Sequence, residues 1–133
     1  ENIENIVFIP RMPMSEIGGV LEHADVLLVH LKRDPLFEIT VPSKTQAYMA
    51  MGKPLLMAVS GDAADIVQKA KCGRIALSED IESIKKAILE IYHLSTDEQC
   101  QLGLNAKQFY DENLSLSRGT QQFIEIFKRV KDA

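Results

Sequence analysis

The chain has 133 residues, of which 46% are hydrophobic and 26% charged, and its formal net charge is −4. This length allows one hydrophobic core, and the composition argues against disorder. Lysine and arginine are mixed with aspartate and glutamate throughout, which disfavours nucleic-acid binding. No apolar run approaches the length of a bilayer span, and the first residues do not resemble a signal peptide. We therefore expect a single domain over residues 1–133.

The first residue and the two cysteines indicate the context of the chain. It begins at Glu1 rather than at a methionine, directly before a strand-like run, which indicates a fragment of a longer protein. Cys72 and Cys100 have neither metal-ligand spacing nor a disulfide framework around them, so we interpret both as packing residues. This usage is typical of a reducing compartment and predicts a cytoplasmic protein.

The first third of the chain predicts two strands and one helix. Residues 6–9 are a short apolar run rich in β-branched residues, closed by Pro10, and predict a buried strand. An amphipathic helix follows, with Ile17 on its apolar face. Residues 26–31 are apolar almost throughout, as in a parallel sheet covered on both faces. Residues 32–41 show no clear period and predict a loop.

The middle of the chain alternates helices with strands. Ser43 is expected to cap a helix that runs to about Met51. Residues 54–59 predict a third buried strand, and residues 63–72 a helix with one apolar face. Residues 74–77 predict a fourth, short strand. This alternation predicts an α/β fold, a Rossmann-like parallel sheet of about four strands with flanking helices.

The last part of the chain predicts helices only. Their apolar stripes are Ile81, Ile84, Ile88 and Ile91 in the first helix, Leu102, Ala106 and Phe109 in the second, and Phe123, Ile124, Phe127 and Val130 in the third. A capping box is expected at the start of the second, formed either by Ser95 with Glu98 or by Thr96 with Gln99.

Ligands of open parallel sheets bind beyond the carboxyl ends of the strands, where helix N-termini present free N–H groups. The sequence Pro-Ser-Lys-Thr at residues 42–45 places two hydroxyls and one ammonium group at such a helix start. These groups would form a cradle for a diphosphate, with Lys44 as a point charge. Plain N-capping by Ser43 beside a solvated Lys44 accounts for the same residues equally well. Neither a dinucleotide fingerprint nor a P-loop is present.

The run VPSKTQAYMAMGKPLLMAVSGDAADIVQKAKCG, residues 41–73, resembles the donor-binding region of retaining family-4 glycosyltransferases. It is most similar to the branch that builds bacterial surface polysaccharides such as capsule and O-antigen. The resemblance extends over about residues 5–95, whereas residues 96–133 match only in being helical. Its most specific pieces are Pro42-Ser43-Lys44, Tyr48-Met49-Ala50 and Gly52-Lys53-Pro54.

The resemblance implies that the chain is part of the C-terminal domain of a GT-B enzyme. Such an enzyme transfers a sugar from a nucleoside diphosphate, here expected to be UDP, to a saccharide or lipid-linked acceptor. The acceptor would bind the missing N-terminal domain, so the fragment alone is expected to be inactive. No metal or other cofactor is implied, and the full-length protein could sit at the inner membrane face. Alternatives are a non-catalytic nucleotide-binding or assembly module and a sugar-nucleotide epimerase of the same architecture.

The implied donor site is distributed over several segments. Lys44 and Glu38 would act in catalysis, Lys44 on the leaving diphosphate and Glu38 near the sugar. His30, at a strand end, could hydrogen-bond the sugar or phosphate, or be an ordinary strand-end histidine. The other implied positions are Arg11 and Met12 at the base, Ser43 and Thr45 at the diphosphate, Gln46 beside them, and Gly61 and Asp62 at the sugar.

One position departs from the family pattern. The family commonly has a glutamate, five residues before the motif glycine, that binds the ribose hydroxyls. Counting back from Gly52 reaches Ala47, and the neighbouring Gln46 is turned away by about 100° on a helix. The resemblance therefore implies either a different mode of holding the ribose or a weaker site.

The position of the fragment within this fold also predicts its strand order. The family places two further βα units before residues 6–9, and their strands lie between residues 6–9 and residues 26–31. We expect the fragment to close this gap by direct pairing, which gives the strand order 1-2-3-4. An unclosed gap would leave an exposed edge and favour self-association.

Overall fold

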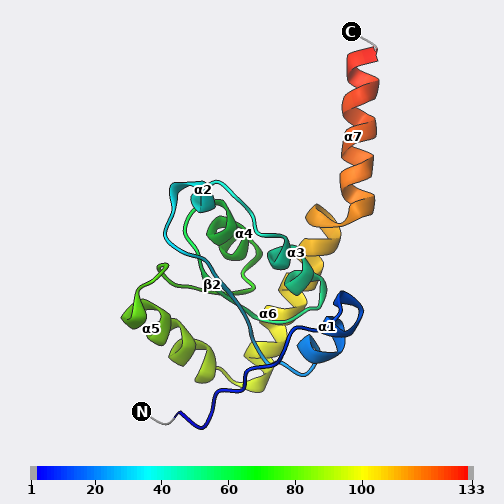
Figure 1. Ribbon diagram of the computed structural model, residues 1–133. Coiled ribbons are helices and arrows are strands. Elements are labelled where there is room, and N and C mark those ends of the chain that lie inside the picture. Colours follow the sequence, from blue (N-terminus) through cyan, green and yellow to red (C-terminus); the bar gives the residue numbers. More distant parts are fainter. Residues whose placement is uncertain (1–2, 132–133) are drawn as a thin grey trace.

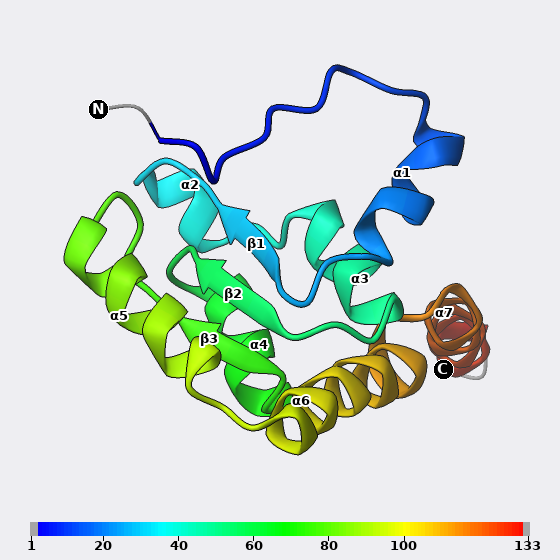
Figure 2. The same ribbon diagram turned by 90° about the horizontal axis from the view of Figure 1, so that it is seen from below.

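Three short parallel strands form the centre of the computed structural model, which describes residues 3–131. They are β1 (Leu27–His30), β2 (Leu55–Ala58) and β3 (Gly73–Ile75), hydrogen-bonded in the order β1-β2-β3. Val29 lies opposite Met57, and Met57 lies opposite Ile75. The predicted α/β class and the chain order of these strands are confirmed (Figure 2).

Helices surround the sheet and continue beyond it (Figure 1). In chain order they are α1 (Met14–Leu21), α2 (Pro35–Glu38), α3 (Ser43–Ala50), α4 (Asp62–Ala70), α5 (Ile81–Tyr92), α6 (Thr96–Phe109), the π-helix η1 (Tyr110–Leu114) and α7 (Leu116–Lys131). The three trailing helices were predicted from their apolar stripes. The short helix α2 was not, although Asp34 caps it through the N–H of Leu36 and Pro35 begins it.

The larger core lies between one face of the sheet and the helices α3, α4 and α6. Val29 and Met57 of the sheet pack there with Met49 of α3, Val67 of α4 and Ala106 of α6, all at most 1% exposed. Burial of these side chains supplies most of the driving force for this layer, at roughly 1.5–3 kcal/mol for each large one.

The smaller core lies on the opposite face, which α5 covers. Leu56 and Ala58 of β2 pack against Ala87 and Ile91 of α5. The predicted α5 stripe is thus only partly right, because Ala87 takes the buried position whereas Ile81 is 80% exposed.

The predicted strand at residues 6–9 is wrong, and so is the four-stranded sheet. These residues are irregular and exposed, with Phe8 at 92% exposure, and Figure 2 shows the segment running outside the sheet. The neighbouring α1 has no buried residue either. An apolar run forms a strand only where a sheet edge and a covered face receive it, and here all four side chains of residues 6–9 are more than half exposed.

Two local predictions also need correction. Ser43 is not the N-cap of α3 but its first residue, and Pro42, which has no side chain that can accept a hydrogen bond, occupies the cap. Cys72 is buried as expected, whereas Cys100 is exposed and does not pack. The capping box of α6 is the one formed by Ser95 with Glu98.

The last helix, α7, extends away from the rest of the molecule (Figure 1). It has no buried residue. Among the helices within residues 3–131, none combines the length and apolarity that crossing a bilayer requires.

Candidate functional site

Three loops meet at the carboxyl ends of the strands, where ligands of such sheets usually bind. The loop after β1 is tied to the loop after β3 by Arg33. The backbone N–H of Arg33 donates to a carboxylate oxygen of Glu79 at 2.9 Å, and the Arg33 guanidinium donates to the carbonyl of Ser78 at 3.2 Å. The sequence did not predict a role for Arg33, Ser78 or Glu79.

His30 ends β1 at this edge and has a structural partner. The backbone N–H of Glu79 donates to the His30 Nε2 at 3.3 Å. Glu79 has a positive φ of 59°, an uncommon conformation for a residue with a side chain. The histidine thus contacts the loop after β3 while its side chain remains exposed.

The loop after β1 also closes over the turn after β2. The backbone of Glu38 lies so close to Gly61 that any side chain on Gly61 would overlap it, and Gly61 has a φ of +80°. The hollow between this loop and the Ser60 turn has a volume of about 10 Å³, lined among others by Phe37 and Ser78. One water molecule needs about this much room, so this part of the edge has no space for a larger ligand in the structure.

The residues of the predicted cradle lie in the first turn of α3. Because α3 connects two parallel strands, its N-terminus lies at their carboxyl side. Ser43 and Gln46 are exposed, Lys44 is half-buried, and Thr45 is completely buried. The amide of Thr45 already donates to the carbonyl of Pro42 at 2.8 Å. In the part of the chain that the structure describes, the amides of Ser43 and Lys44 have no partner outside the helix.

The Thr45 hydroxyl is buried without a hydrogen-bond partner among the described residues. Thr45 lies one helical turn before Met49, which is also fully buried, so both face the core. An unsatisfied buried hydroxyl costs about 1–3 kcal/mol, and such groups are rare in folded proteins. This spacing from Met49 is the sequence signal that would have predicted its burial.

The first turn of α4 differs in charge from that of α3. Gly61 occupies the cap position of α4, and the exposed Asp62 and Asp65 lie in its first turn. These carboxylates already complement the positive end of the helix and would repel a phosphate. The first turn of α3 contains Lys44 and no acidic residue. Of the two helix starts, α3 is therefore the more favourable to an anion.

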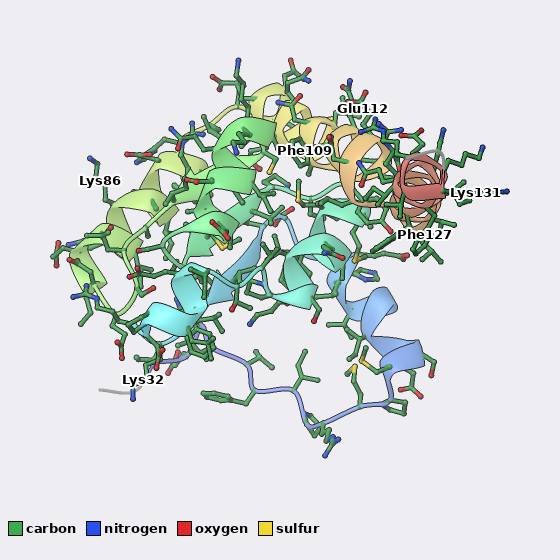
Figure 3. All side chains as sticks on the ribbon, turned by 90° about the horizontal axis from the view of Figure 1, so that it is seen from above. Lys32, Lys86, Phe109, Glu112, Phe127 and Lys131 are labelled. Carbon is green, nitrogen blue, oxygen red and sulfur yellow. The ribbon has the colours of Figure 1, made fainter. Side chains whose placement is uncertain are left out.

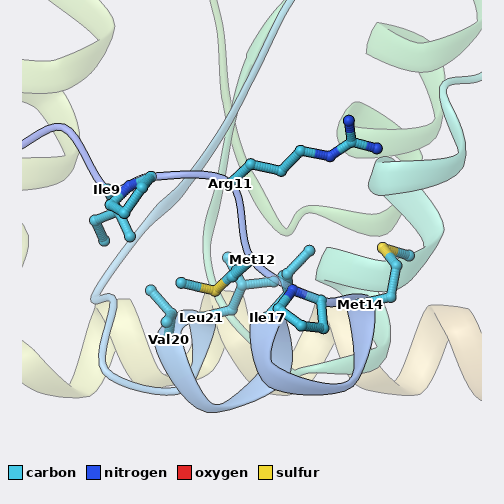
Figure 4. A pocket seen from close by; sticks show the side chains of 9 residues that line it. Ile9, Arg11, Met12, Met14, Ile17, Val20 and Leu21 are labelled. Atoms are coloured by element: carbon cyan, nitrogen blue, oxygen red, sulfur yellow. The ribbon is translucent and has the colours of Figure 1, made fainter.

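Arg11 and Met12 lie elsewhere, on a groove beside α1. In Figure 4, Met12 lies by Val20 and Leu21, whereas Arg11 extends away from them. The groove has a volume of about 690 Å³, and its walls are mostly apolar. It shares no lining residue with the hollow of about 10 Å³ at the carboxyl edge. The structure thus brings Glu38 next to Gly61 but places the two predicted base-binding residues on a surface of their own.

Neither a metal cluster nor an activated thiol adds chemistry to this edge. Within residues 3–131, no group of three or more His, Cys, Asp or Glu side chains is arranged to hold a metal ion. Burial raises the pKa of the Cys72 thiol to about 11, which disfavours its nucleophilic thiolate.

Comparisons with family models, with curated proteins and with solved structures give no significant match to this chain.

Proposed function

We propose that the chain binds the diphosphate of a nucleoside-diphosphate sugar at the first turn of α3. It would serve as the donor-binding part of a glycosyltransferase. The proposal depends mainly on the combination of Lys44, the free amides of Ser43 and Lys44, and the absence of acidic residues in this turn. The helix dipole adds partial positive charge to the same place. The motif resemblance of residues 41–73 supplies the identity of the anion.

The buried hydroxyl of Thr45 faces the core beside Met49, so it would reach a ligand only after the first turn of α3 rearranges. Its oxygen lacks a partner, and its neighbours along the chain are the exposed Ser43 and the half-buried Lys44. A small rearrangement that opens Thr45 to a phosphate oxygen would satisfy the hydroxyl and recover part of its desolvation cost.

Donor binding would also require the loop of residues 32–38 to move away from Gly61. The backbone of Glu38 now occupies the space over this turn. Once displaced, Glu38 would become free to reach the donor sugar, and Gly61 would allow the sugar a close approach to the backbone.

In the proposed reaction, the bond between the anomeric carbon and the diphosphate oxygen breaks, and the sugar passes to an acceptor hydroxyl. Negative charge grows on the departing diphosphate. Fixed N–H groups and the Lys44 ammonium would stabilise the more negative diphosphate of the transition state more strongly than the diphosphate of the bound donor. This difference would lower the activation barrier. Retention of configuration is implied only by the resemblance.

A second candidate function is nucleotide binding without catalysis. It is favoured by Ala47, which stands where the family has its ribose-binding glutamate, and by the lack of space for a donor sugar beside Glu38. Turnover of a UDP-sugar by a protein that joins this chain to an acceptor-binding domain distinguishes the two functions.

Titration calorimetry of the chain with UDP, GDP and several UDP-sugars tests the proposed site. We expect UDP and UDP-sugars to bind, and Lys44→Ala to weaken binding at least about tenfold, because a charge-assisted contact to phosphate is lost. Lys69→Ala, an exposed lysine of α4, is the matched control and should bind like the unmodified chain. Equal affinity of the Lys44→Ala variant, or no nucleotide binding at all, would refute the site.

A further inference from the structure

The helix α7 has an apolar face whose side chains remain exposed among the residues that the structure describes. None of its 16 residues is buried, and Figure 1 shows it projecting from the rest of the molecule. Its large apolar side chains are between 48% and 84% exposed: Leu116, Phe123, Ile124, Ile126, Phe127 and Val130. The rings of Phe123 and Phe127 stack on each other with centroids 6.4 Å apart.

This apolar face is wide. At 100° per residue, Leu116, Phe123, Phe127 and Val130 form a central stripe, and Ile124 and Ile126 lie on either side of it. The whole face covers about 160° of the helix circumference. A helix that pairs with one other helix needs only a narrow seam, with charged residues at the flanking positions. In α7 the flanks are isoleucines, so the face suits a broad apolar surface.

The helix α7 is basic in an otherwise acidic chain. The helix contains the cations Arg118, Lys128, Arg129 and Lys131 and one anion, Glu125, so its net charge is +3. Because the whole chain carries −4, the other 117 residues carry −7. At 100° per residue, Arg118 and Arg129 lie opposite the apolar stripe, Lys128 lies beside the apolar face, and Lys131 lies at its edge, where its long side chain extends outwards (Figure 3).

We propose that α7 binds to the surface of a bilayer that contains anionic lipids. The helix would lie in the plane of the interface, with Phe123 and Phe127 among the acyl chains and Lys128, Arg129 and Lys131 at the headgroups. Apolar burial and attraction to anionic headgroups are the two terms that hold such helices. The acidic remainder of the chain is repelled by the same surface, so α7 is the part that docks. A second copy is the less favourable occupant, because two α7 helices that each carry a net charge of +3 would repel each other.

Co-sedimentation of the full chain with vesicles tests this proposal. We expect binding to vesicles of mixed zwitterionic and anionic phospholipid, and weak or no binding to purely zwitterionic ones. Lys128→Glu with Arg129→Glu should weaken binding at least about 25-fold, since each basic residue near an anionic surface contributes about fivefold. Phe123→Ala with Phe127→Ala should weaken it at least about tenfold.

Matched controls use the same changes away from α7. Lys85→Glu with Lys86→Glu makes the same charge change on exposed positions of α5, and Phe8→Ala removes a ring that is 92% exposed. Both controls should bind vesicles like the unmodified chain. Equal binding to neutral vesicles, unchanged binding by either α7 variant, or self-association through α7 without vesicle binding would each overturn the proposal. Sedimentation velocity without lipid detects the last outcome.

Discussion

The backbone of Glu38 rests directly on Gly61, so that the loop after β1 closes the turn after β2. Only a residue without a side chain allows this approach, because a Cβ on Gly61 would overlap the Glu38 carbonyl. The φ and ψ of Gly61, +80° and −144°, are also accessible almost only to glycine. One position thus determines both the shape of the turn and the closure of the edge where a donor is proposed to bind.

Gly61→Ala is expected to destabilise the chain by about 1–3 kcal/mol from backbone strain alone, and by more if the loop of residues 32–38 is displaced. Denaturant unfolding measures this change. Gly18→Ala in α1 is the matched control, since its added methyl meets open space, and it should raise stability by up to about 1 kcal/mol. A Gly61→Ala chain as stable as the unmodified one would show that the close approach is not maintained in solution.

Thr45→Val tests the unsatisfied hydroxyl. The substitution keeps the shape of a buried side chain and removes a polar atom that has no partner, so stability should stay equal or rise by about 1 kcal/mol. Ser78→Ala is the contrasting control, because the Ser78 hydroxyl is also buried but donates to the Ala58 carbonyl at 3.1 Å. Loss of this hydrogen bond in Ser78→Ala should lower the free energy of unfolding by about 1 kcal/mol. If Thr45→Val lowered the free energy of unfolding as much as Ser78→Ala does, the Thr45 hydroxyl would have a hydrogen-bond partner in solution.

The strands β1 and β2 could be predicted from the sequence because each is a short apolar run that packs on the larger core. Val29 and Met57 carry this signal, and both are fully buried. Residues 6–9 carry the same local signal, yet they form no strand. The difference lies in tertiary contacts, since local pattern shows that a run is apolar but not whether an edge is available to receive it.

The candidate site was predicted in part for a similar reason. The position of residues 42–45 after a strand predicts a helix start at the carboxyl edge, and α3 begins there. The contact of Glu38 with Gly61 joins positions more than 20 residues apart, and no local pattern reports it. The same holds for the hydrogen bond from Glu79 to His30. Sequence periodicity describes elements, whereas these contacts depend on how loops pack on one another.

The two cysteines should differ strongly in reactivity. Burial raises the pKa of Cys72 from 9.0 to about 11, and Cys100 is exposed. At pH 8 a disulfide reagent should label one thiol of the folded chain rapidly, and Cys100→Ser should abolish this phase. Because the pKa of Cys72 is raised by folding, its contribution to stability is fully present below about pH 9 and is lost as the pH rises towards 11. Rapid labelling in the Cys100→Ser chain would show that Cys72 is accessible.

The capping box of α6 should give the chain a measurable dependence on acid. The backbone N–H of Ser95 donates to the Glu98 carboxylate at 2.8 Å, and the Ser95 hydroxyl donates to it at the same distance. These bonds favour the ionised form, so they lower the pKa of Glu98 from 4.5, the backbone bond contributing most. A carboxyl whose pKa is lowered by folding stabilises the native state above its unfolded pKa, and this stabilisation disappears as the pH falls through the folded value.

In Glu98→Gln the amide cannot titrate, so the stability difference between the two chains should be largest at neutral pH and shrink below about pH 4.5. Urea unfolding at several pH values measures this difference, and Glu125→Gln on the exposed helix α7 makes the same change in charge without touching a cap. If the advantage of glutamate over glutamine at position 98 stayed constant down to pH 2.5, the two hydrogen bonds from Ser95 would not be made in solution.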